Sequence, residues 1–138
     1  TVEILREKIF DSAPTIRAKA IELLALAQDL QSKEQIIRGL VDPDVEVCIT
    51  TIQAVAYLGL REVTPVLIEN LQHPDLRIVN TSRDALKILW EKVIGATKIE
   101  SINDWKSFWE NVKNQVPSPL YRENISPLVD KDFQYFIG

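Results

Sequence analysis

The feature that most constrains the fold is an internal repeat. Three segments share a proline, an aliphatic residue two positions later, an alanine eleven positions later and an aliphatic residue twelve positions later. Their prolines, Pro14, Pro43 and Pro74, are 29 and then 31 residues apart. The other shared positions are Ile16, Val45 and Leu76; Ala25, Ala54 and Ala85; and Leu26, Val55 and Leu86. Such a period is typical of proteins built from stacked supersecondary units.

Each copy predicts a first helix. Proline is well tolerated in the first helical turn, where its missing N–H would have no partner in any case. The side chains of Ser12 and Asp42 are expected to cap the free amides, and His73 is a weaker cap in the third copy. Apolar residues at helical spacing follow. The expected ends of the three helices are Gln28-Asp29, Gly59 and Gly95.

A second, shorter helix is expected to close each unit. Ser32–Gln35 and Ser101–Asp104 have the pattern of a capping box, and Pro65 starts the second helix of the middle unit. Upstream, Leu5 and Ile9 indicate the second helix of an incomplete leading unit, in a register about two residues off. The apolar stripes are Ile36, Ile37 and Leu40; Leu67, Ile68 and Leu71; and Trp105, Phe108, Trp109 and Val112.

The segments Asp42–Val47, Ala54–Gly59 and Glu62–Leu71 resemble the short HEAT repeat of the phycobilisome-lyase type, and the resemblance covers residues 11–113. It implies an all-α chain, a right-handed α-solenoid of about three helix pairs over residues 1–114. Glu46 stands where the family pattern has a base, which weakens any charge ladder between units. Asn80 stands where a small apolar residue is usual, which marks the third unit as divergent.

Residues 115–138 form a separate, proline-rich C-terminal tail. Pro117, Pro119 and Pro127 rule out one continuous helix there. The tail also holds too many apolar and aromatic residues for a disordered linker. Three interpretations stay open: the tail folds back and caps the open end of the stack, it docks on another subunit, or it is disordered.

The sequence offers little for catalysis or metal binding. His73 is the one histidine and is expected in a loop ahead of Pro74, so we expect neither a triad nor a zinc site from it. Cys48 is the one cysteine, so no internal disulfide can form. Cys48 lies in an apolar helical window and is predicted to be a small buried thiol. The 4 glycines form no phosphate loop. HEAT-like iron hydroxylases carry paired His-Glu steps, which this chain lacks. We therefore expect no enzymatic activity, no metal and no cofactor.

Several other side chains have a plain structural interpretation. Glu69, Asp84 and Glu91 fall on helical surface positions, which favours solvated charges over acid–base work. The tryptophans could stack on a ligand, but their place on an apolar stripe favours the core. The glycosylation triplets at Asn80 and Asn124 are interpreted as chance matches.

The charge and the hydropathy pattern limit the partners. A net charge of −4 and a pI near 5.0 argue against nucleic acid as the main partner. No run of eighteen apolar residues is present, so we expect no membrane span. Without a signal-peptide pattern, the default location is the cytoplasm. The sequence contains no Met, and we expect a processed form or an excised domain. It does not set the oligomeric state.

The resemblance places the binding surface on the concave side, which the second helices form. It implies that mixed, mostly polar side chains are exposed there: Gln35, Arg38, Gly39, Val66, Glu69 and Asn70. This mixture suits a protein or peptide, so the leading hypothesis is a non-catalytic interaction scaffold or assembly subunit. The alternatives are a bilin lyase or chaperone, which would bind a tetrapyrrole, and a DNA-repair-like HEAT protein, which the acidic pI disfavours.

Overall fold

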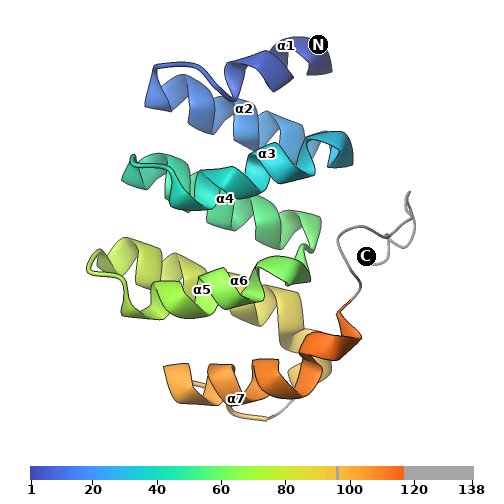
Figure 1. The fold of residues 1–138 in the computed structure, drawn as a ribbon, viewed down its shortest axis with the longest axis vertical. Coiled ribbons are helices and arrows are strands. Elements are labelled where there is room, and N and C mark those ends of the chain that lie inside the picture. Colours follow the sequence, from blue (N-terminus) through green and yellow to red (C-terminus); the bar gives the residue numbers. More distant parts are fainter. Residues whose placement is uncertain (96, 117–138) are drawn as a thin grey trace.

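The computed structural model describes residues 1–95 and 97–116, and every regular element in that part of the chain is helical (Figure 1). Five one-turn 3-10 helices, η1 to η5, lie beside the α-helices. The α-helices are α1 (Val2–Lys8), α2 (Pro14–Leu26), α3 (Lys33–Arg38), α4 (Val45–Leu58), α5 (Thr64–Glu69), α6 (Leu76–Ile94) and α7 (Ile102–Val112). The prediction of an all-α solenoid is confirmed. The predicted capping or docking tail lies outside the described residues from Pro117 onwards.

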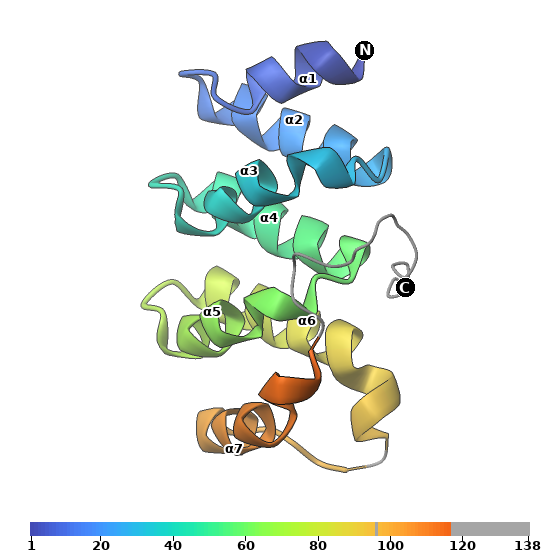
Figure 2. The same cartoon turned by 45° about the vertical axis from the view of Figure 1, so that its right-hand side comes forward.

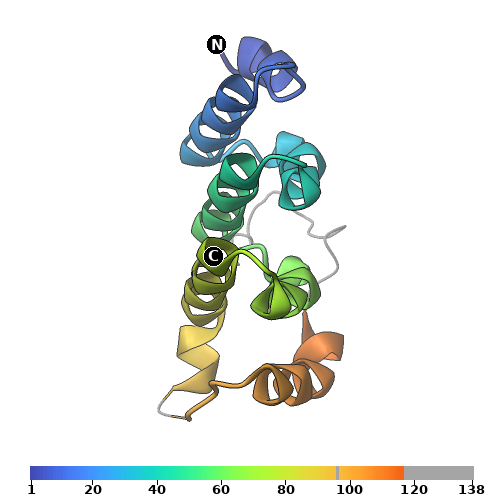
Figure 3. The same ribbon diagram turned by 90° about the vertical axis from the view of Figure 1, so that its left-hand side faces the viewer.

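The helices form two layers, as Figures 2 and 3 show from two sides. The longer first helices α2, α4 and α6 stack in one layer, and the shorter second helices α1, α3, α5 and α7 stack in the other. Helix α1 is the second helix of a leading unit, as Leu5 and Ile9 predicted. Ile9 is buried and Leu5 packs against the same core.

The units repeat every 31 residues. The first helices begin at Pro14, Val45 and Leu76, and the second helices α3 and α5 begin at Lys33 and Thr64. The predicted spacing of 29 residues between the first two copies is therefore wrong by two. The reason is that Pro14 is the first residue of its helix, whereas Pro43 and Pro74 precede the N-caps of α4 and α6.

The corrected period also brings the leading unit into register. Leu5 aligns with Ile36 and Leu67 at intervals of 31 residues, and Ile9 aligns in the same way with Leu40 and Leu71. The two-residue slip expected in the leading unit came from aligning the prolines and does not exist in the structure.

Just before each first helix, a side chain accepts a hydrogen bond from a nearby backbone N–H. The residue two positions before each N-cap accepts a hydrogen bond from the N-cap N–H, which is the geometry of an Asx turn. The bonds run from Ala13 N to Asp11 Oδ1 (2.8 Å), from Asp44 N to Asp42 Oδ1 (2.9 Å) and from Asp75 N to His73 Nδ1 (2.9 Å). In the third unit the imidazole of His73 therefore accepts the hydrogen bond that a carboxylate accepts in the first two units.

The caps themselves differ from those expected. Asp44 and Asp75, not Asp42 and His73, accept from amides of the first turn, and Ser12 does not cap α2. Ser32 does not form a capping box either: its side chain accepts no amide of α3, and its Oγ donates to Asp29 Oδ2 at 2.6 Å. The capping box of Ser101 and Asp104 is confirmed. The expected helix ends are also confirmed, with positive φ at Gln28, Gly59 and Gly95.

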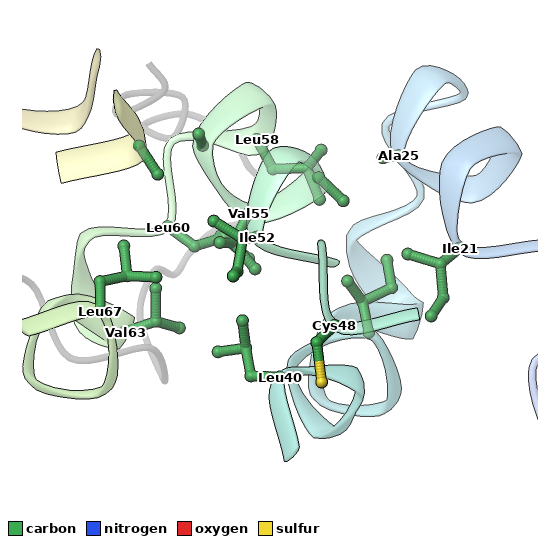
Figure 4. Close-up of a cluster of buried hydrophobic side chains, with 14 of the residues drawn as sticks. Ile21, Ala25, Leu40, Cys48, Ile52, Val55, Leu58, Leu60, Val63 and Leu67 are labelled. Atoms are coloured by element: carbon green, nitrogen blue, oxygen red, sulfur yellow. The ribbon is translucent and has the colours of Figure 1, made fainter. Parts of the chain in front are cut away.

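The core lies between the two layers and runs through all the units. Figure 4 shows its middle part, from Ile21 of α2 to Leu67 of α5. Several of its side chains are fully buried: Leu24, Ile36, Val47, Ile52, Val55, Leu67 and Leu86. Cys48 is buried as predicted, and its Sγ lies 3.0 Å from the carbonyl oxygen of Asp42. Burial raises the pKa of this thiol. The thiol is therefore part of the core.

The third unit departs from the pattern. Helix α6 has 19 residues, whereas α4 has 14, because α6 continues through Trp90, the position that corresponds to Gly59. The Trp90 indole N–H donates to Thr64 Oγ1 at 2.9 Å, and its ring meets Phe108 edge to face with centroids 4.9 Å apart. Trp105 is fully buried. The prediction that the tryptophans serve the core is confirmed for Trp90 and Trp105, and Trp109 is partly buried against it.

The fold predicts a specific steric conflict at Gly39. A methyl group there would clash with Thr51 Oγ1 on α4. We expect Gly39→Ala to lower the free energy of unfolding by about 1–3 kcal/mol, the usual cost of overpacking. The cost should fall in a Thr51→Ala background, because the hydroxyl that causes the clash is gone. Urea unfolding of the four proteins measures this coupling, and an equal cost in both backgrounds would contradict the packing described.

Candidate functional site

The solvent side of the second helices is the candidate site. The core stripes of α1, α3 and α5 leave most residues on the opposite side of each helix facing solvent, and Val66 there also packs partly against the core. Three repeat positions occupy that side. We call their residues the second-helix face: Glu3, Ile4 and Glu7 on α1; Glu34, Gln35 and Arg38 on α3; and Pro65, Val66 and Glu69 on α5.

The structure places the predicted site residues on or beside this face. Arg38 and Glu69 are exposed, and Gln35 and Val66 are partly exposed. Asn70 follows directly at the start of η4 (Asn70–Gln72) and is also partly exposed. Whether these side chains bind a partner stays a prediction.

The prediction that Gly39 is exposed on the binding surface is wrong. It is buried, not exposed, and its Cα faces the side chain of Thr51 in α4. The first residue of η2 (Gly39–Val41) brings the backbone so close to α4 that only glycine fits. This glycine belongs to the packing of the unit and is not part of the face.

The sequence reasoning missed the contribution of α1, one residue of α3 and the exposed Pro65 of α5. Glu3, Ile4 and Glu7 are exposed on α1, and Glu34 is exposed on α3. The signal was present in the sequence, because Glu7 lies 31 residues before Arg38, which lies 31 before Glu69. Aligning the repeats on their prolines gave a spacing of 29 residues between the first two copies, so these three residues were not recognised as equivalent.

The charges of the second-helix face form no close pairs within the described part of the chain, although Glu3 interacts electrostatically with Arg6. None of the side chains of Glu3, Glu7, Glu34, Arg38 and Glu69 forms an ion pair or a hydrogen bond there. All five are exposed. They are therefore available to a binding partner.

Four ion pairs join neighbouring elements in the described part of the chain, in contrast. The inter-unit or inter-element pairs are Arg6–Asp29 (2.8 Å), Arg17–Asp42 (2.9 Å), Lys33–Glu62 (3.2 Å) and Arg77–Glu46 (2.7 Å). Glu46 was expected to weaken a charge ladder between units; it pairs with Arg77 of the next unit, but uncharged Thr15 stands 31 residues before it, so the pairing joins two units only. These charges belong to the scaffold.

Two of the scaffold carboxylates have shifted pKa values. Hydrogen bonds from Arg6, assisted by the Ser32 hydroxyl, lower the pKa of Asp29 although partial burial opposes them. Burial raises the pKa of Asp42, and the hydrogen bonds from Arg17 and the Asp44 N–H outweigh it, so that the net shift is downward. Both carboxylates are therefore ionised at neutral pH and hold neighbouring elements together.

The described residues show no geometry for metal chemistry. No group of three or more His, Cys, Asp or Glu side chains among them is placed to hold a metal ion. The imidazole of His73 is engaged by the Asp75 N–H. Glu69, Asp84 and Glu91 are exposed, as predicted for surface charges. No helix in residues 1–95 or 97–116 is long and apolar enough to cross a membrane.

The repeat geometry agrees with a comparison against known families. Residues 2–87, more than half of the chain, match the model of HEAT repeats. The chain belongs to the HEAT repeat family. The match starts in α1 and so includes the leading second helix of this HEAT stack. It is a match to HEAT repeats in general, and the phycobilisome-lyase type stays a prediction. A comparison with curated proteins gave no match.

The paired carboxylates predict how the stability of this HEAT stack depends on pH. The pKa of Asp29 is lower in the folded chain than its ordinary value of 3.8, so the unfolded chain takes up the proton first. The resulting stabilisation is present above that value and is lost as the pH falls through the lowered pKa. We expect Asp29→Asn to destabilise the protein at pH 7 and to cost progressively less towards pH 2, as measured by urea midpoints.

Asp84→Asn is the matched control, since Asp84 is an exposed carboxylate on α6. It should leave the urea midpoint nearly unchanged at pH 7. A cost of Asp29→Asn that is the same at all pH values would contradict the ionic link to Arg6.

Proposed function

We propose that this HEAT repeat chain is a non-catalytic interaction module that binds a protein or peptide segment along the second-helix face. The observation that carries the proposal is the row of Glu7, Arg38 and Glu69. These residues occupy one repeat position on three consecutive second helices, and all three are exposed. Their charges are unpaired in the described structure, while ion pairs join neighbouring elements of the scaffold.

The scaffold supports binding because it holds these charges in place before a partner arrives. Ordering flexible elements on association costs free energy, and a framework that is already rigid avoids much of that cost. The backbones that carry Glu7, Arg38 and Glu69 belong to helices anchored in one continuous core. A partner that crosses the row would meet fixed charges of alternating sign, which favours one register of binding over others.

The neighbouring residues suit an extended polypeptide. Gln35 and Asn70 carry amide groups that can donate to a carbonyl and accept from an N–H. Ile4 and Val66 occupy the same repeat position and add apolar contact beside the charges. Together these groups have the mixed polar and apolar character of a non-obligate protein interface. HEAT repeats commonly serve as protein-interaction scaffolds, which agrees with this proposal.

Site-specific crosslinking tests this function in cells that make the protein. A photo-crosslinking amino acid at Gln35 or Asn70 should capture a discrete partner protein, because both positions border the charged row. The same amino acid at Gln53 of α4 or Asn80 of α6 is the control, since both are exposed on the first-helix layer.

The double variant Arg38→Glu, Glu69→Lys keeps the net charge while it reverses two charges of the row. It should retain the far-UV circular dichroism of the parent and lose the crosslinked species. Equal capture from both layers, or capture that charge reversal leaves unchanged, would contradict the proposed face.

A further inference from the structure

We infer that the segment bound by the second-helix face is a basic, extended peptide of a protein partner. The inference rests on the proposed function and adds the chemistry of the partner. The unpaired charges of the face are four carboxylates, Glu3, Glu7, Glu34 and Glu69, and one guanidinium, Arg38.

The basic residues nearest to the face offset these carboxylates only in part, and Arg6 interacts electrostatically with Glu3. Lys33 pairs with Glu62 at 3.2 Å, and Arg6 pairs with Asp29 at 2.8 Å. Lys8 lies 3.9 Å from Asp11 at the end of α1. The face therefore presents a net negative field, which attracts a partner with an excess of Lys or Arg and repels the phosphates of a nucleic acid.

The spacing of the carboxylates favours an extended partner over a single cation. Glu3 and Glu7 are four residues apart on one helix, so their Cβ atoms are about 6 Å apart. Glu7 and Glu69 lie on α1 and α5, two units apart along the stack. The described residues hold no cluster of three acidic groups close enough for a metal ion. Several cationic side chains on one chain can reach carboxylates spread in this way.

The row of Glu7, Arg38 and Glu69 sets a pattern for the bound segment. A polyproline-like or extended chain advances about 9–10 Å in three residues, which is close to the spacing of directly packed helices such as α2, α4 and α6, whose stacking sets the advance from one unit to the next. A basic residue, an acidic residue three positions later and a second basic residue three positions after that would oppose the three charges of the row. Ile4, which is 54% exposed beside Glu7, favours an apolar residue next to the end of the segment that lies on α1.

Peptide titrations followed by NMR test the inference on the full 138-residue chain. The first probe is a synthetic peptide with Lys, Glu and Lys at three-residue intervals, and the second has Glu, Lys and Glu at the same places. We expect the first peptide to shift the backbone amide signals of α1, α3 and α5 at low salt. The second should bind at least tenfold more weakly, and salt should weaken the binding of the first.

Variants keep the test specific to the face. Glu7→Lys with Glu69→Lys should weaken binding of the first peptide at least tenfold. Asp84→Lys on α6 is the control, because it also replaces an acidic residue by a basic one but lies outside the face. It should weaken binding of the first peptide less than twofold. Equal binding of the two peptides, or tighter binding of a short oligonucleotide or of Ca²⁺ at the same amides, would overturn the inference.

The two proposals can fail separately. If crosslinking at Gln35 and Asn70 captures a partner while the basic peptide binds no better than the acidic one, the second-helix face is an interface but its partner is not basic. If the crosslinks are absent as well, the proposed function itself is wrong.

Discussion

The apolar stripes of the first helices can be buried only by the neighbouring units, and the rest of the structure depends on this. Leu24 of α2, Ile52 and Val55 of α4 and Leu86 of α6 are fully buried in a core shared by consecutive units. Burying one such side chain is worth about 1.5–3 kcal/mol relative to leaving it in water. A single helix pair has no second neighbour to supply that burial, so the units are stable as a stack.

The stack also determines where a binding surface can lie. Because the units repeat after 31 residues, Glu7, Arg38 and Glu69 occupy the same position on three consecutive second helices. Ion pairs such as Arg17–Asp42 join the elements of the scaffold and are partly shielded from solvent. The charges of the second-helix face play no such part, which leaves them for a partner.

Much of the fold could be predicted from the sequence, because helical periodicity reports directly on burial. The helix pairs, the leading helix with Leu5 and Ile9, and the buried Cys48 follow from that pattern alone. The register of the first unit could not be predicted in this way, because proline is tolerated both at the start of a helix, as in Pro14, and before its N-cap, as in Pro43. The Asx-like role of His73 and the burial of Gly39 depend on three-dimensional approach, which periodicity does not reveal.

The three tryptophans give the most direct test that the units stabilise one another. All of them lie in the last unit, at Trp90, Trp105 and Trp109, far along the chain from Leu24 in α2. Leu24→Ala should cost about 2–5 kcal/mol. Urea unfolding followed by tryptophan fluorescence should then shift to lower urea together with the circular dichroism signal. A fluorescence midpoint that stays at the parent value, while circular dichroism shows an early separate transition, would contradict a stack held together through its interfaces.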